Sequence, residues 1–233
     1  MIGYKYYYPF TNPKYAELAF EERLALLVDR ECSGRNDRRT QHRIKLAIFP
    51  LPAEIEDLDL SPGRGLDRRF ILELAQCLWV ASHLNTLVLG PTGGGKTFLA
   101  CALGLAAARS NYSVRYIRTS RLLYPLAQSH LDDYYLALLA GFAKLDLLIL
   151  DDWMRDPITA PSAQDLLEVL DDRFGRVSTI VASQVPVADW FARFPDPTLG
   201  DAILDRIVHN AYRLNLEGES RRKTRSAIPM SST

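Results

Sequence analysis

Residues 90–97 (GPTGGGKT) have the types and spacing of a loop that binds phosphate. They match G-x-x-x-x-G-K-[ST], in which glycines let backbone N–H groups surround a phosphate. Lys96 would supply positive charge to the terminal phosphate oxygens, and the Thr97 hydroxyl can ligate Mg²⁺. An apolar run before the loop and an Ala- and Leu-rich stretch after it predict the strand and helix that this motif requires. We expect ATP to contact Gly90, Pro91, Thr92, Gly93, Gly94, Gly95, Lys96, Thr97 and Phe98.

A second motif follows further along the chain, where the apolar run 147–150 ends in Asp151 and Asp152. The carboxyl end of a buried parallel strand lies at the edge of the sheet where ligands bind in open α/β folds. We expect Asp151 to hold Mg²⁺, through water, and Asp152 to orient and polarise the attacking water. Together with the loop, this motif predicts a Mg²⁺-dependent ATPase.

Apolar strands alternate with helical patterns through the rest of the chain. The sequence predicts helices at 66–82, 96–109, 164–173 and 202–209, with one or two more in 120–144. It predicts strands at 86–90, 114–117, 145–150, 179–182 and 212–216. This alternation is typical of a parallel α/β sheet with helices on both faces.

The N-terminal part of the chain has a different pattern. Helical periodicity extends from residue 13 to about 47, with a second helix expected at 36–47. Prolines and a glycine then punctuate a linker. We expect a helical N-terminal region with a basic helix and linker at 1–60, and an ATPase domain at 61–233.

The composition limits the class of protein. Among 233 residues, 28 basic side chains balance 28 acidic ones, which excludes a uniformly basic coat for nucleic acid. Three widely spaced cysteines argue against a disulfide framework and a zinc site, and favour the cytoplasm. The longest apolar stretch, 98–108, is shorter than the roughly 18 residues that a membrane span needs.

A local basic cluster stands out against the zero net charge. Its members fall within helical reach of one another, so one helix face can be basic. Because aromatic residues do not interleave, this face fits contact with a duplex backbone better than stacking on single strands. A solvated helix face is the alternative. The candidate DNA-binding residues are Arg35, Arg38, Arg39, Arg43 and Lys45.

Six segments carry a resemblance to the IstB-like ATPases, relatives of the DnaC helicase loaders within the AAA+ class. They are residues 20–31, 61–75, 90–104 (GPTGGGKTFLACALG), 145–153 (LDLLILDDW), 178–191 (STIVASQVPVADWF) and 196–220 (DPTLGDAILDRIVHNAYRLNLEGES). The resemblance implies a P-loop AAA+ ATPase with a five-stranded parallel sheet, preceded by a small helical region.

The resemblance also assigns roles to single residues. Gln184 stands where the family places its sensor-1 residue, and Arg222 is a sensor-2 candidate. Arg206 matches the arginine that reaches the γ-phosphate of a neighbouring subunit, which implies a homo-oligomer with shared ATP sites. Asp152 stands where many AAA+ proteins carry Glu, which is one methylene longer, so slow catalysis is expected.

The implied function is assistance to an insertion-sequence transposase, through binding of double-stranded target DNA and stimulation of the transposase. A DnaC-like helicase loader, with single-stranded DNA and a replicative helicase as partners, is the alternative within the family. A nucleotide-bound adaptor that does not hydrolyse ATP and a P-loop kinase are alternatives of other classes.

Overall fold

The computed structural model describes residue 15 and residues 18–61, 63–130 and 134–218. The chain divides into two compact units, with the boundary between His42 and Arg43. Each unit is considered by itself in the paragraphs below.

The N-terminal unit is built on α2 (Phe20–Ala47), a single continuous helix whose last residues belong to the second unit. The expectation of a separate helix from residue 36 was wrong. Gly34 costs only about 1 kcal/mol inside a helix, and Arg35 donates to Glu31 at 2.7 Å one turn earlier, which supports the helix at this point. Within the described ranges, no helix is both long and apolar enough to cross a membrane.

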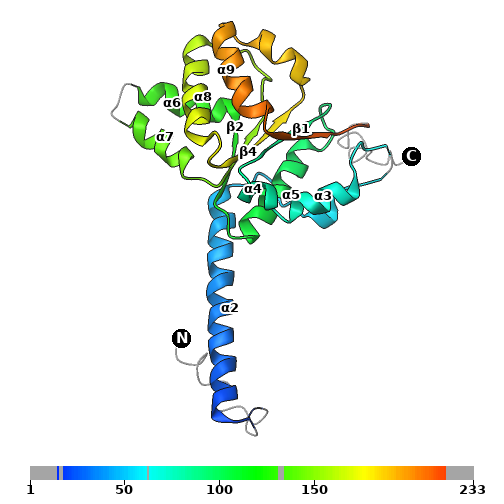
Figure 1. The fold of residues 1–233 in the computed structure, drawn as a ribbon, viewed down its shortest axis with the longest axis vertical. Coiled ribbons are helices and arrows are strands. Elements are labelled where there is room, and N and C mark those ends of the chain that lie inside the picture. The colour runs from blue at the N-terminus through cyan, green and yellow to red at the C-terminus, as the bar shows by residue number, and fades with distance from the viewer. Residues whose placement is uncertain (1–14, 16–17, 62, 131–133, 219–233) are drawn as a thin grey trace, which may run out of the picture. The chain divides into compact units, whose positions relative to one another are not determined.

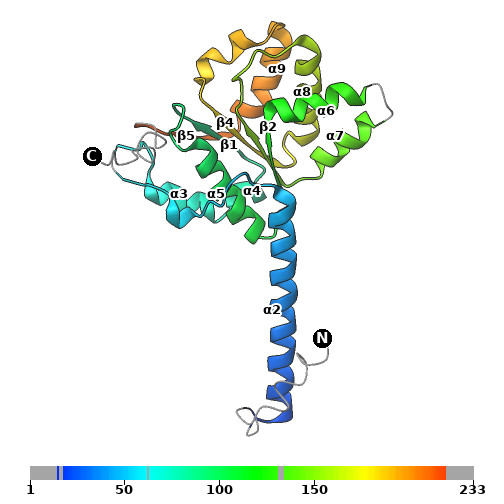
Figure 2. The same ribbon diagram turned by 180° about the vertical axis from the view of Figure 1, so that it is seen from behind.

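The second unit is a five-stranded parallel sheet with the order β2-β3-β4-β1-β5. The strands are β1 (Asn85–Leu89), β2 (Val114–Arg118), β3 (Leu147–Asp151), β4 (Ser178–Ser183) and β5 (Ala211–Asn215). Helices cover both faces, as Figures 1 and 2 show, so the predicted fold class is confirmed. The central strands β1, β3 and β4 are almost wholly buried, as expected for strands covered on both sides.

One face of the sheet packs against α5 (Lys96–Arg109), together with α3 (Arg68–Ala75) and α4 (Leu78–Ala81). A single helix at 66–82 was expected, and this was wrong. Cys77 has a φ of 61°, in the left-handed region that a continuing helix cannot use, so the chain breaks between α3 and α4.

The other face packs against four helices whose side chains form a second core cluster. They are α6 (Thr119–Ser129), α7 (Tyr135–Ala143), α8 (Ala160–Arg173) and α9 (Pro197–Val208). Short 3₁₀ turns complete the unit at Ile55–Asp57, Val187–Asp189 and Phe191–Arg193. The last two helices begin earlier than expected, because Thr159 and Asp196 cap their N-termini ahead of a proline.

The segment expected as a linker packs into the core of the sheet unit. Ala47 and Ala53 are buried there, and Phe49 and Leu51 pack beside them. Gly104 of α5 makes this packing possible, because a Cβ atom would lie 2.9 Å from the Phe49 ring and 2.6 Å from Ile149. The division between the two compact units, at His42 and Arg43, lies ahead of this segment in the chain.

Candidate functional site

A cavity of about 380 Å³ opens at the carboxyl edge of the sheet, within the range typical of ligand sites. Five separate segments meet there: Leu51 from the chain ahead of α3, the loop after β1 with the start of α5, the end of β2, the end of β3 with the turn that follows it, and the residue after β4. The lining residues are Leu51, Thr92, Gly93, Gly95, Lys96, Thr97, Phe98, Arg118, Asp151, Asp152, Arg155 and Gln184. The parallel sheet thus brings the phosphate loop and the acidic motif to one place.

The loop's glycines are required by its geometry. Gly95 has a φ of 100°, which disfavours any side chain, and a Cβ atom at Gly90 would lie 2.6 Å from the Leu216 carbonyl oxygen. Lys96 begins α5, and its ammonium donates to the carbonyl oxygens of Gly90 at 2.8 Å and Pro91 at 2.9 Å. The positive charge and the helix N-terminus are therefore both held beside the loop.

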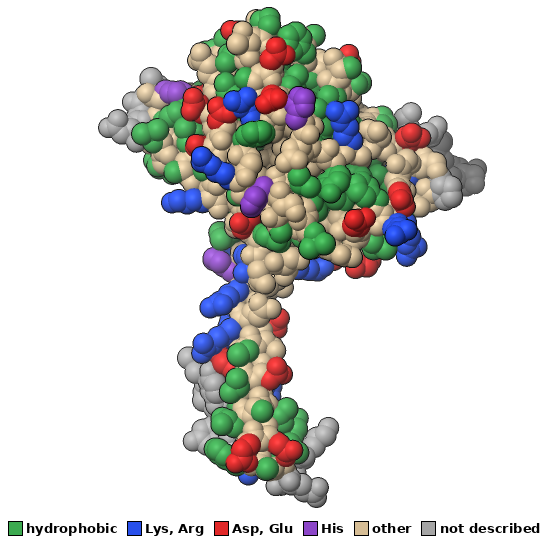
Figure 3. Space-filling view, in the orientation of Figure 1, with side chains coloured by type: hydrophobic (Ala, Val, Ile, Leu, Met, Phe, Trp, Pro, Cys, Tyr) green, Lys and Arg blue, Asp and Glu red, His purple; other side chains and the backbone are tan. Residues whose placement is uncertain are grey.

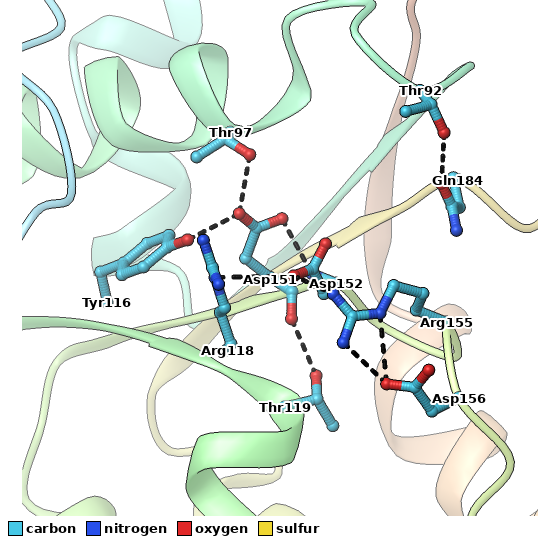
Figure 4. Close-up of polar contacts among 10 residues, drawn as sticks. All are labelled: Thr92, Thr97, Tyr116, Arg118, Thr119, Asp151, Asp152, Arg155, Asp156 and Gln184. Carbon is cyan, nitrogen blue, oxygen red and sulfur yellow. Dashed lines mark hydrogen bonds and ion pairs between the residues drawn. The ribbon is translucent and has the colours of Figure 1, made fainter.

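The Asp151 carboxylate joins α5, the helix that follows the phosphate loop, to the sheet. Its side chain is buried, with the residue 4% exposed. Oδ2 accepts hydrogen bonds from the Thr97 hydroxyl and the Tyr116 hydroxyl, both at 2.7 Å, and Oδ1 accepts one from the Asp152 N–H at 2.8 Å (Figure 4). These donors are neutral, so they orient the carboxylate and leave its charge available to a cation.

The residues fit the Mg²⁺ site that the sequence predicts. Mg²⁺ takes hard oxygen ligands and is usually held by one or two carboxylates with water and phosphate oxygens. A hydroxyl and a carboxylate within 2.7 Å of each other, beside a phosphate loop, supply that donor set.

Tyr116 and Cys101 are neighbours of Asp151 that the sequence analysis did not identify. Burial and the hydrogen bond to Asp151 raise the pKa of the Tyr116 phenol. Burial and the charge of Asp151 raise the pKa of the Cys101 thiol to about 12. Both groups therefore stay protonated at neutral pH, and Tyr116 remains a donor.

Asp152 extends from a strained turn and is engaged by two arginines. Its φ of 54° is left-handed, a conformation that costs about 1 kcal/mol or more in a non-glycine residue. Its Oδ2 lies 3.0 Å from Arg155 Nη1 and 3.6 Å from Arg118 Nε. Arg118 ends β2, so its presence at this edge follows from the sheet order; the loop position of Arg155 had no comparable signal in the sequence.

Gln184 directly follows β4 and reaches the phosphate loop. Its Oε1 accepts a hydrogen bond from the Thr92 hydroxyl at 2.5 Å, which joins the end of β4 to the loop (Figure 4). The structure thus places this candidate sensor on the cavity wall.

Arg206 lies away from this cavity. Its backbone carbonyl accepts from the Asn85 side chain at 2.9 Å, at the amino end of β1, which is the opposite edge of the sheet. Its guanidinium pairs with Asp171, donates to the Ala202 carbonyl at 3.0 Å and lies over the Phe174 ring. Arg206 therefore does not join the site of its own chain, and Arg222 falls outside the described residues.

The candidate DNA-binding residues differ in their surroundings. Arg35, Arg38 and Arg39 are exposed on α2, and Figure 3 shows basic side chains along this helix. Arg35 and Arg38 share Glu31, at 2.7 and 3.4 Å. Lys45 is also exposed, whereas Arg43 is half-buried and donates to the Ala108 carbonyl at 3.2 Å. Arg43 thus has a packing role that the sequence pattern did not reveal.

Comparison with known proteins identifies the family to which the chain belongs. The model of the family of IstB-like ATP-binding proteins matches residues 10–228. The chain belongs to this family. One similar relative, named an insertion sequence ATP-binding protein of Sinorhizobium fredii, is 44% identical over 91% of this chain and 87% of its own.

Solved structures share the fold of this IstB-like chain. The structure of DnaI matches with a TM-score of 0.61 and 22% identity, over 72% of this chain and 95% of that chain. The DnaC helicase loader matches with a TM-score of 0.55 and 15% identity, over 71% of this chain and 97% of that chain. At these identities the likeness concerns the AAA+ fold alone.

The Tyr116–Asp151 hydrogen bond predicts a pH-dependent loss of stability in Tyr116→Phe. At pH 8 we expect the variant to be about 1–2 kcal/mol less stable to urea, because a buried carboxylate loses a donor. Above about pH 10 the tyrosine ionises in the unfolded chain but stays protonated in the folded chain, since its folded pKa is raised. The contribution of Tyr116 is then lost as pH rises, so the difference between wild type and variant shrinks.

Urea unfolding at pH 8 and at pH 10.5 measures this effect, with the exposed Tyr124 changed to Phe as the matched control. If the difference in free energy of unfolding between wild type and Tyr116→Phe were the same at both pH values, the folded-state pKa of Tyr116 would not be raised as described.

Proposed function

We propose that this IstB-like chain binds Mg²⁺–ATP in the cavity at the carboxyl edge and hydrolyses it. The observation that carries the proposal is the 2.7 Å contact between the Thr97 hydroxyl and the Asp151 carboxylate, beside Lys96. This contact joins the two motifs that phosphoryl-transfer sites of this class require.

The cavity residues that the sequence singles out have roles that follow from their positions. Lys96 and the N–H groups at the start of α5 bind the phosphates. Thr97 and Asp151 would hold Mg²⁺, which when bound offsets phosphate charge and orients the phosphates. Asp152 orients the attacking water, and Gln184, held by Thr92, contacts either the water or the terminal phosphate.

A shared site is proposed for Arg206. A group on the amino edge cannot complete a site on the carboxyl edge of the same sheet, but a neighbouring copy can present it there. Arg206 lines an open surface groove with Val187, Asp201 and Leu204, which supports this role. We therefore propose a homo-oligomer in which Arg206 stabilises transition-state charge in the next subunit.

The biological role proposed for the chain is assistance to the transposase of an insertion sequence. The name of the Sinorhizobium relative supports this context. We propose that α2 binds duplex target DNA through Arg35, Arg38 and Arg39. These exposed side chains fall within about 100° of the helix circumference, as phosphate contact along one face requires.

A nucleotide-bound adaptor that does not hydrolyse ATP is the second candidate. The observation that favours it is the engagement of Asp152 Oδ2 by Arg155 at 3.0 Å, since an ion-paired carboxylate is poorly placed to act on water. In an adaptor, Asp152→Asn would leave function intact while Lys96→Ala would abolish assembly.

Two substitutions separate nucleotide binding from hydrolysis. We expect Lys96→Ala to abolish binding of a fluorescent ATP analogue, because the phosphates lose their fixed positive charge. We expect Asp152→Asn to keep binding and to lower the rate of phosphate release by about 100-fold or more, the scale of lost general-base catalysis. Equal hydrolysis by wild type and Asp152→Asn would contradict the assigned role of Asp152.

Removing the basic face of α2 tests DNA binding. We expect the triple change of Arg35, Arg38 and Arg39 to Ala to weaken duplex binding in fluorescence anisotropy by about 10-fold or more at moderate salt. The slope of log affinity against log salt should fall by about 3, because each lost phosphate contact contributes about 0.9. The loss should be similar for different duplex sequences.

A matched triple change of exposed basic residues on the sheet unit, at Lys144, Arg176 and Arg213, serves as the control. An equal loss in both triple variants would mean that binding follows total charge and not α2. A single-stranded probe of the same length distinguishes a helicase loader, which would prefer it.

A further inference from the structure

Arg155 is shared between two aspartates at the mouth of the cavity. Its Nη1 donates to Asp152 Oδ2 at 3.0 Å, while Nε and Nη2 donate to Asp156 Oδ2 at 3.2 and 2.8 Å (Figure 4). The hydrogen bond to Asp156 and the nearby aspartate charges raise the pKa of Arg155, so the guanidinium stays charged. The Arg155 guanidinium therefore contacts the carboxylate of Asp152, the candidate base, and the carboxylate of Asp156 at the same time.

The backbone keeps Arg155 within reach of Asp152. The Arg155 N–H donates to the Asp152 carbonyl at 3.2 Å, which closes a tight turn. Trp153, in the middle of this turn, has a fully buried side chain, and its backbone N–H donates to the Ala182 carbonyl of β4 at 3.0 Å. Asp152 and Met154 both have left-handed φ angles, of 54° and 55°. A turn anchored in this way holds the side chains of Asp152 and Arg155 on the same side.

The contact restricts the direction in which Asp152 can act as a base. A carboxylate that orients a water needs an oxygen free to accept its hydrogen bond. Arg155 and, at 3.6 Å, Arg118 both engage the same oxygen, Oδ2. The two contacts hold Oδ2 and so limit the rotation of the carboxylate, which leaves Oδ1 to accept from a water only in the direction that this rotation allows.

We propose that Arg155 is a positioning residue that restrains Asp152 and slows ATP hydrolysis, and that Asp156 weakens this restraint by competing for the same guanidinium. The inference rests on the proposed function, because it concerns the rate of the reaction assigned to the cavity. It gives the two members of the Arg155–Asp156 pair opposite effects on that rate.

The opposite signs make the test sharp. We expect Arg155→Gln to raise kcat for ATP about 3- to 5-fold, the scale of a half-exposed ion pair, and the affinity for a fluorescent ATP analogue is measured separately so that any change in binding is not read as a change in rate. Arg155→Lys should give an intermediate rate, because an ammonium can still pair with Asp152. Asp156→Asn should lower kcat about 2- to 3-fold, because Arg155 then pairs with Asp152 alone. Arg176→Gln, an exposed arginine at the amino edge, is the control.

A purely structural role would move both variants in the same direction. If Arg155→Gln and Asp156→Asn both lowered kcat, or if Arg155→Gln left it unchanged, the inference would be overturned. Arg155→Gln should also add nothing in the Asp152→Asn background, and an additive effect there would count against it. If the wild type did not bind nucleotide, or bound it without needing Lys96, the proposed function itself would be overturned. Because binding is measured separately from the rate, this failure can be distinguished from failure of the inference.

Discussion

The structure of the site depends on the buried carboxylate of Asp151. This side chain accepts hydrogen bonds from Thr97 on α5, from Tyr116 on β2 and from the next backbone N–H of its own chain. A buried carboxylate without such partners would be costly, so the three segments must keep their relative positions. The phosphate loop and the acidic motif are distant in sequence, and this one group sets the geometry between them. The close packing of Gly104 against Ile149 of β3 supports the same alignment of α5 on the sheet.

The candidate functional residues lie at two opposite edges of the parallel sheet. The carboxyl edge collects the loop, both aspartates and Gln184, because the carboxyl ends of β1, β3 and β4 meet there. The amino edge holds Arg206, which interacts with Asp171 and Phe174. Because all five strands run in the same direction, residues at the carboxyl edge and residues at the amino edge cannot meet within one chain. A shared site between copies is the arrangement in which all the assigned residues act together, and we propose it on that ground.

Local patterns predicted most of the fold and the centre of the site. The strands, α5 and the phosphate loop followed from apolar runs and from a motif with strict spacing. The errors arose where tertiary packing or backbone strain overrides local signals: Gly34 lies inside a continuous helix, and Cys77 breaks a helix by adopting a left-handed conformation. Expected linker residues such as Phe49 pack in the core because Gly104 leaves room for them. Tyr116, Arg118 and Arg155 were not predicted, because their roles depend on which strands are neighbours and on how one turn is folded.

The most direct test of the central claim is ATP affinity with and without Mg²⁺, measured by calorimetry for the wild type and Asp151→Asn. The amide keeps the size of the side chain and removes its charge, while Lys96 and the loop glycines, as proposed, would still bind the phosphates. We predict that the wild type gains affinity on addition of Mg²⁺ and that Asp151→Asn loses this gain while keeping its metal-free affinity. An undiminished gain in Asp151→Asn would contradict the account, since it would place the metal at other residues.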